Sequence, residues 1–135
     1  MTQEVVALAV MGIDQHENGV MAVSRVLMES QIQVEYLGTC QTPESVAEKA
    51  IARDADVIGI SCHSWEYLTL VPQLLEELKR RASPIDVIIG GSVITREDAL
   101  IMKDAGVAEV FTSSTENFDM VECVRQLSAD RSNRL

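Results

Sequence analysis

The fold is decided by one stretch near the N-terminus, VVALAVM at residues 5–11 followed by GIDQHENG at residues 12–19. The apolar run has the length and composition of a buried β-strand. Beyond the polar loop, apolar residues recur at helical spacing and predict a helix over residues 20–30. This order of strand, loop and helix places Asp14 and His16 at the carboxyl end of a strand, where open parallel sheets bind ligands.

The alternation of strand and helix continues along the chain. Further strands are predicted at 34–37 (ended by Gly38), 57–61, 87–89 and 107–112, and further helices at 43–53, 68–82, from Thr95 to Gly106, and from 118 onwards. Near-continuous apolar strands indicate a parallel sheet with helices on both faces. Right-handed crossovers favour the flavodoxin-like (Rossmann-like) strand order 2-1-3-4-5. We therefore predict an α/β domain over residues 1–128 and a flexible tail at 129–135.

Composition limits the function classes. The 135 residues are 47% apolar, enough for a full core. No apolar run approaches the roughly 18 residues of a membrane span, and the N-terminus lacks the basic region of a signal peptide. We thus expect a cytoplasmic protein, and three cysteines, an odd number, agree with a reducing compartment. A formal net charge of −10 argues against nucleic acid or an anionic membrane surface as a partner.

The predicted strand order brings two polar loops together. The first and third strands are neighbours, so the crevice between their carboxyl ends is the expected binding site. Asp14 is close enough in sequence to accept the Nδ1 proton of His16, which would leave Nε2 free as a metal ligand. Ser61 follows the third strand, and Gly90-Gly91 after the fourth would let a ligand approach the backbone. The plain alternatives are a histidine that only caps a helix and a serine that only ends a strand.

Three motifs at set intervals carry a family resemblance. They are Asp14-x-His16-x-x-Gly19, then Ser61 after 41 intervening residues, then Gly90-Gly91 after a further 28. Together they resemble the cobalamin-binding domain of B12-dependent mutases and methionine synthase. The segments QTPE at 41–44 and LTLVP at 68–72 resemble the acyl-CoA mutase branch, which includes methylmalonyl-CoA, isobutyryl-CoA and 2-hydroxyisobutyryl-CoA mutases. The resemblance covers residues 5–127.

The resemblance implies adenosylcobalamin as cofactor, with its dimethylbenzimidazole base detached from cobalt and His16 in its place as the lower axial ligand. The matching Asp14 would then set the tautomer of His16. The detached nucleotide tail would enter a slot between sheet and helices, where Ser61 hydrogen-bonds the base and residues 112–115 form the far wall. The cofactor-binding residues implied are Asp14, Gln15, His16, Glu17, Asn18, Gly19, Ser61, His63, Trp65, Leu68, Gly90, Gly91, Ser92, Thr112 and Ser113.

The same resemblance implies a partner. In the mutases, a (β/α)8 barrel holds the acyl-CoA substrate against the cofactor. A chain of this size resembles the small subunit of a two-component mutase, an isomerase, with no catalytic residue of its own and no activity alone. A corrinoid methyltransferase carrier fits less well, because such proteins usually have a helical domain ahead of the motif.

Some residues depart from the family pattern, among them Val10 where the mutases often have a lysine, and two other functions stay open. His63 stands where leucine is usual, and Trp65 stands where glycine is expected, so Trp65 should either fill space that the cofactor would use or stack on it. The carboxyl ends of three strands also bring together two cysteines and two histidines, which could form a tetrahedral zinc site. These zinc candidates are His16, Cys40, Cys62 and His63. A degenerate domain that binds no corrin and serves as a sensor or interaction module is the other alternative.

Overall fold

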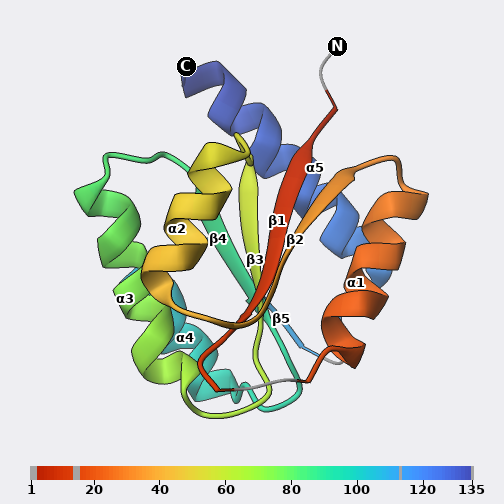
Figure 1. The fold of residues 1–135 in the computed structure, drawn as a ribbon. Helices are drawn as coiled ribbons and strands as arrows, with labels where there is room; N and C mark the ends of the chain where they lie inside the picture. Colours follow the sequence, from red (N-terminus) through yellow and green to blue (C-terminus); the bar gives the residue numbers. More distant parts are fainter. Residues whose placement is uncertain (1–2, 14–15, 113, 135) are drawn as a thin grey trace.

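The computed structural model describes residues 3–13, 16–112 and 114–134. Five strands form one parallel sheet in the order β2-β1-β3-β4-β5, which confirms the predicted topology (Figure 1). The strands are β1 (Val5–Met11), β2 (Gln33–Gln41), β3 (Val57–Ser61), β4 (Asp86–Gly90) and β5 (Glu109–Phe111). The helices are α1 (Asn18–Glu29), α2 (Pro43–Ala52), α3 (Tyr67–Arg80), α4 (Arg96–Ala105) and α5 (Asn117–Arg134). Within the described ranges, no helix is long and apolar enough to cross a membrane.

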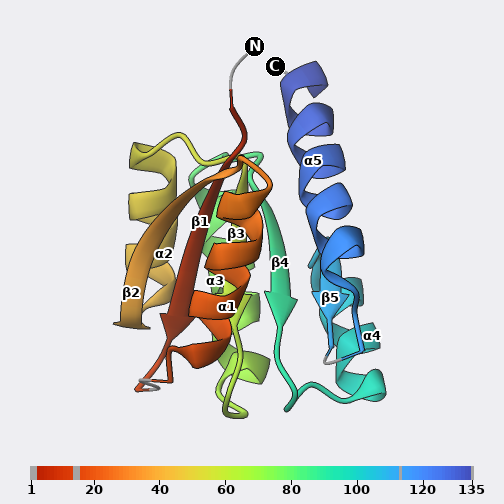
Figure 2. The same cartoon turned by 90° about the vertical axis from the view of Figure 1, so that its right-hand side faces the viewer.

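The sheet is the middle of three layers. Helices α1 and α5 cover one face, and α2, α3 and α4 cover the other (Figures 1 and 2). Side chains of β1 alternate between the two cores, with Leu8 facing α1 and α5 and Ala9 facing the other helices. Both cores are buried, which explains the continuous apolar run of this strand. The carboxyl ends of the strands meet at the lower edge in Figure 1, opposite both termini.

Strand β2 is longer than predicted. The sequence suggested that Gly38 ends the strand, but β2 continues to Gln41 and its register against β1 shifts twice on the way. Gly38 has φ 110° and Cys40 has φ 55°, both in the left-handed region. A β-bulge absorbs such residues without ending the strand, and glycine adopts this conformation without a Cβ clash. The prediction of a strand end at Gly38 was therefore wrong.

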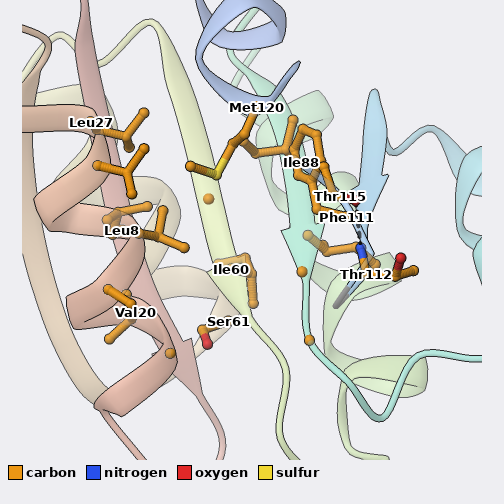
Figure 3. A pocket seen from close by; sticks show the side chains of 18 of the residues that line it. Leu8, Val20, Leu27, Ile60, Ser61, Ile88, Phe111, Thr112, Thr115 and Met120 are labelled. Carbon is orange, nitrogen blue, oxygen red and sulfur yellow. Dashed lines mark hydrogen bonds between the residues drawn. The ribbon is translucent and has the colours of Figure 1, made fainter. Parts of the chain in front are cut away.

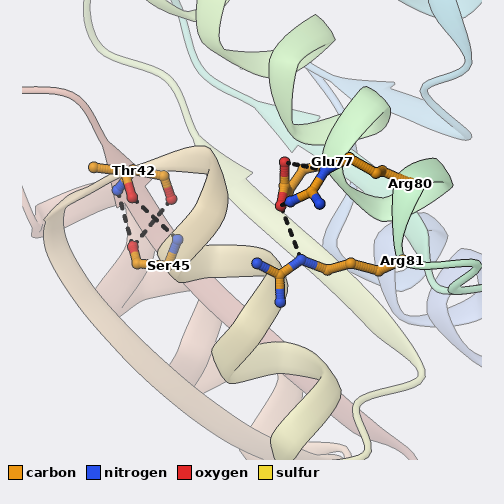
Figure 4. Close-up of polar contacts among 5 residues, drawn as sticks. All are labelled: Thr42, Ser45, Glu77, Arg80 and Arg81. Atoms are coloured by element: carbon orange, nitrogen blue, oxygen red, sulfur yellow. Dashed lines mark hydrogen bonds and ion pairs between the residues drawn. The ribbon is translucent and has the colours of Figure 1, made fainter.

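The start of α2 follows the prediction. The Ser45 amide donates to Thr42 Oγ1 at 3.0 Å, and the Thr42 amide donates to Ser45 Oγ at 2.9 Å (Figure 4). Pro43 takes the first helical position, where its missing N–H costs nothing. This reciprocal cap satisfies a backbone amide that the helix itself leaves without a partner, and it fixes where the chain leaves the sheet edge.

Helix α3 carries a buried carboxylate, Glu77. Its carboxylate accepts hydrogen bonds from the guanidinium groups of Arg80 and Arg81, and the Arg81 Nε to Glu77 Oε1 distance is 2.9 Å (Figure 4). The hydrogen bond from Arg80 is the larger cause, and that from Arg81 the next, that holds the pKa of Glu77 below its ordinary value. Burial acts in the opposite direction and raises this pKa. The carboxylate therefore stays charged within the fold at neutral pH.

The C-terminal residues differ from the predicted flexible tail, because α5 continues to Arg134. Arg131 Nη1 donates to Asp56 Oδ1 at 2.9 Å, and Arg131 Nη2 donates to Asp54 Oδ1 at 3.1 Å. Asp56 also accepts from the Val5 amide at 2.9 Å, so the last turns of α5 are connected to the start of β1. These contacts join residues far apart in sequence, which a local polar composition does not indicate.

Candidate functional site

A cavity of about 420 Å³ lies between helices α1 and α5 and the sheet. It falls within the range of roughly 300–1,000 Å³ that is typical of small-molecule sites. Leu8, Val20 and Leu27 line one side, and Phe111 and Met120 line the other (Figure 3). Other apolar lining residues are Ala22, Val23, Val26, Ile60, Ile88, Ile89 and Val124. The interior is therefore suited to an apolar group.

The mouth of this cavity is polar. Ser61 Oγ and His63 Nε2 are 2.7 Å apart in a hydrogen bond, and both residues line the cavity. The ring of His16 lies beside the ring of His63, with 5.6 Å between centroids and a tilt of 36°. His16 comes from the loop after β1, Ser61 from the last position of β3 and His63 from the loop that follows, as the strand order predicted. Two imidazoles and a hydroxyl thus gather at one end of an apolar chamber.

Two glycines shape the same region. A Cβ on Gly19, at the start of α1, would lie 3.1 Å from His63 Cε1, so the missing side chain makes room for that imidazole. A Cβ on Gly91 would lie 2.0 Å from the carbonyl oxygen of Cys62, which no side chain could tolerate. Gly91 is therefore required by the approach of the loop after β3, in addition to leaving the cavity open.

The loop after β5 forms the far wall. Thr112 and Thr115 line the cavity, and the Thr112 amide donates to Thr115 Oγ1 at 3.0 Å. The Thr115 amide donates back to the Thr112 carbonyl at 3.0 Å, and Thr112 Oγ1 and Ser114 Oγ are 2.9 Å apart. These bonds hold the loop in a compact turn between β5 and α5, as expected for hydroxyl side chains in turns.

The His16 loop is anchored from the neighbouring strand. The Tyr36 hydroxyl, on β2, donates to the carboxylate of Glu17, the residue that precedes α1. Burial, with the hydrogen bond and charge of Glu17 adding to it, raises the pKa of Tyr36 to about 12. Glu17 therefore positions the start of α1 from outside the cavity.

The predicted site residues separate into groups. Those that line the cavity are Gly19, Ser61, His63, Gly90, Gly91, Ser92 and Thr112. His16 contacts the ring of His63, whereas Asp14, Gln15 and Ser113 lie outside the described residues. Glu17 and Asn18 are exposed and do not line this cavity.

Trp65 and Leu68 lie away from the cavity. Trp65 is 72% exposed, so it does not fill the slot, contrary to one of the two roles expected for it. Leu68 packs against the core on the opposite face of the sheet. Neither side chain therefore shapes the chamber.

The zinc arrangement is not formed. Among the described residues, which include all four candidates, no group of three His, Cys, Asp or Glu side chains is placed to hold a metal ion. Cys62 is buried with the core on the α2 and α3 face, whereas His63 faces the cavity. These two candidate ligands, which follow the end of β3, therefore lie on opposite sides of the sheet.

The apolar lining was not predicted from the sequence, although a signal for it exists. Gly59 and Ser61 alternate along β3 on the face that carries the cavity, and Val20, Val23 and Leu27 form the inner stripe of α1. The two-residue period of the strand and the helical spacing of α1 would have predicted that these β3 positions and this face of α1 face each other. The polar motifs and the resemblance predict the mouth of the site and a slot behind it, but not the apolar side chains that line that slot.

Comparison with known proteins agrees with this geometry. The family model described as the B12 binding domain matches residues 4–122. The chain therefore belongs to the B12-binding domain family, which confirms the resemblance drawn from the three motifs.

Within this family, the chain is similar to mutases. It is 36% identical over 129 residues to the 2-hydroxyisobutanoyl-CoA mutase small subunit of Aquincola tertiaricarbonis, covering 96% of this chain and 95% of that subunit. It is 33% identical over 122 residues to a methylmalonyl-CoA mutase of Rhizobium meliloti (strain 1021), covering 90% of this chain but only 17% of that enzyme. The chain thus corresponds to nearly the whole of a small subunit in one relative and to a minor part of the other.

Solved structures agree on the fold. A cobalamin-binding protein from Desulfitobacterium hafniense DCB-2 superposes with a TM-score of 0.79 at 20% identity, over 93% of this chain and 59% of that one. The signal receiver domain of the response regulator NarL from Mycobacterium tuberculosis superposes with a TM-score of 0.71 at 16% identity, over 95% of this chain and 98% of that one. At these identities the likeness establishes the flavodoxin-like fold alone.

Proposed function

We propose that this chain is the cobalamin-binding small subunit of a two-component B12-dependent acyl-CoA mutase. Membership in the B12-binding family and the likeness to a mutase small subunit over nearly its whole length support this proposal. The observation that carries it is the chamber between α1 and α5, which is apolar inside and has Ser61 and His63 at its mouth with His16 beside them. Such a chamber suits a ligand with an apolar ring at one end and polar groups at the other.

In this proposal the chamber holds the nucleotide tail of cobalamin. Leu8, Ile88 and Met120 would surround the detached dimethylbenzimidazole base, and the Ser61 hydroxyl would donate a hydrogen bond to its acceptor nitrogen. Gly90 and Gly91 leave the passage between β4 and the mouth without side chains. The residues present therefore fit an aromatic base carried on a polar linker.

His16 is the proposed lower axial ligand of cobalt. It is exposed at the carboxyl edge of the sheet, and its contact with His63 places it beside the mouth of the chamber. Asp14, by its position two residues earlier, would accept the Nδ1 proton and direct Nε2 toward the metal. A corrin ring ligated there would lie across the sheet edge with its tail pointing into the chamber.

When bound, adenosylcobalamin supplies a cobalt–carbon bond whose homolysis starts a radical rearrangement. The substrate must then be held close to the cofactor and shielded from water. At this edge Ile13 is 85% exposed and Trp65 is 72% exposed, so the chain presents apolar side chains there. We propose that a (β/α)8-barrel large subunit, which binds the acyl-CoA, covers this edge and completes the site.

Reconstitution tests this proposal. The purified chain is titrated with adenosylcobalamin, alone and with the large subunit of an acyl-CoA mutase, and turnover of acyl-CoA thioesters is measured. We expect binding by the chain alone, and turnover only when both subunits are present, saturating near one small chain per active site. Turnover by the isolated chain would contradict the proposal. A chain that binds neither cobalamin nor any large subunit would indicate the degenerate sensor or interaction module instead.

A further inference from the structure

We infer that His63 is a positioning residue that orients the Ser61 hydroxyl, so that this hydroxyl donates to the detached base of the cofactor. The inference rests on the proposed function and deepens it, because it assigns the orientation of the Ser61 hydroxyl to a second side chain, with which Ser61 shares a hydrogen bond. His63 thus adds a polar contact to the proposed cofactor site.

The backbone places the two side chains together. Ser61 ends β3, His63 lies two positions further in the following loop, and both line the cavity between the sheet and helices α1 and α5. The distance of 2.7 Å between Ser61 Oγ and His63 Nε2 is that of a well-formed hydrogen bond. The missing side chain of Gly19 makes room for the imidazole, since a Cβ there would approach His63 Cε1 to 3.1 Å.

A hydrogen bond between these two atoms contains a single proton. If the Ser61 hydroxyl donates it, the hydroxyl has no donor left for a ligand and can only accept. If His63 Nε2–H donates it, the Ser61 hydrogen is free to point into the chamber. The detached base presents an acceptor nitrogen, so the second arrangement is the one that binds it. In that arrangement the two hydrogen bonds run in one direction and strengthen each other.

The chamber stays open with this pair in place. Ser61 and His63 both line the cavity of about 420 Å³, so the imidazole does not block it. A tail can therefore reach the Ser61 hydroxyl without breaking its bond to His63. A histidine that competed with the base for Ser61 would have to move away first.

The test compares cobalamin with cobinamide, the corrinoid that lacks the nucleotide tail. We expect His63→Leu to weaken cobalamin binding by about three- to tenfold, the effect typical of removing one hydrogen bond, and to leave cobinamide binding unchanged. His63→Gln is the matched control, because its amide nitrogen stands the same number of bonds from Cβ as Nε2. We expect this variant to retain most of the affinity.

A double-mutant cycle tests whether His63 acts through Ser61. In a Ser61→Ala background, His63→Leu should produce no further decrease in affinity, because the hydroxyl to be oriented is gone. Nitrogen chemical shifts of His63 should report the Nε2–H tautomer when cobalamin is bound, and thermal unfolding shows that each variant is folded.

The outcomes separate the two proposals. Tighter cobalamin binding by His63→Leu would overturn the inference in favour of a competing histidine, and equal decreases for cobalamin and cobinamide would overturn it in favour of a role at the corrin. Additive effects in the cycle would also contradict it. If the wild-type chain binds neither corrinoid, the proposed function itself fails.

Discussion

A side chain added at the sheet face of the chamber should weaken cofactor binding without unfolding the protein. Gly59 lies on β3 facing the cavity, and a Cβ there would lie 2.7 Å from Leu8 Cδ2 and 3.7 Å from Ile88 Cγ1. The closer atom is the end of a flexible side chain that itself borders the open cavity, so Gly59→Val forces Leu8 into that space. Overpacking a filled core costs about 1–3 kcal/mol. Here the cavity relieves the strain, and valine favours a strand where glycine weakens it.

The weakening of cofactor binding follows from the volume taken. Valine adds three carbon atoms where the base would pack. If the base then buries three fewer methylene-sized groups, at about 0.8 kcal/mol each, binding weakens by about 2.4 kcal/mol, or about 50-fold in affinity. Gly59→Ala should have a smaller effect, and cobinamide binding should not change in either variant. Equilibrium titration with both corrinoids measures this, and urea unfolding checks stability. Unchanged cobalamin affinity in a folded Gly59→Val variant would refute the placement of the tail.

Further predictions concern the scaffold. Arg131→Ala should lower the free energy of unfolding, measured in urea, by about 1.5–3 kcal/mol. The reason is that the side chains of Arg131 and Asp56 are only 12% and 13% exposed and share a charged hydrogen bond. A decrease of less than about 0.5 kcal/mol would contradict this anchoring role. The pKa of Glu77 is lowered on folding, so its stabilising contribution is present above its ordinary value of 4.5 and is lost as pH falls through the folded value. The free energy of unfolding of Glu77→Gln should therefore fall less steeply with decreasing pH than that of the wild type. Equal slopes of unfolding free energy against pH would contradict this role of the Glu77 carboxylate.

The topology could be predicted because its signals are local. The apolar run at residues 5–11, the Thr42-Pro43 helix start and the stop at Gly106 each reflect short-range chemistry, and the crossover rule supplied the strand order. Strand β2 and the end of α5 could not be predicted in the same way. The left-handed conformation of Cys40 and the pairing of Arg131 with Asp56 depend on segments brought together only by the fold.

The mouth of the site and a slot between sheet and helices were predicted, whereas most of the apolar side chains that line the slot were not. Ser61, Gly19 and Gly91 belong to motifs with recognisable spacing, whereas Met120 and Phe111 line the chamber only because α5 and β5 come together there. The orientation of Trp65 was not predictable from its type, since a large aromatic side chain can equally fill a slot or face a partner. Loop residues at a sheet edge are positioned by contacts that leave no periodic pattern.

The most direct test of the central claim is electron paramagnetic resonance of the chain bound to cobalamin in its Co(II) form, prepared with and without ¹⁵N-labelled histidine. If His16 ligates cobalt, labelling converts the nitrogen splitting of the spectrum from the triplets of ¹⁴N to the doublets of ¹⁵N, and His16→Ala abolishes the protein-derived splitting. Triplets that persist in the labelled chain would show that the cofactor's own base still holds the metal, and both the placement of the tail and the assignment of His16 as ligand would be wrong.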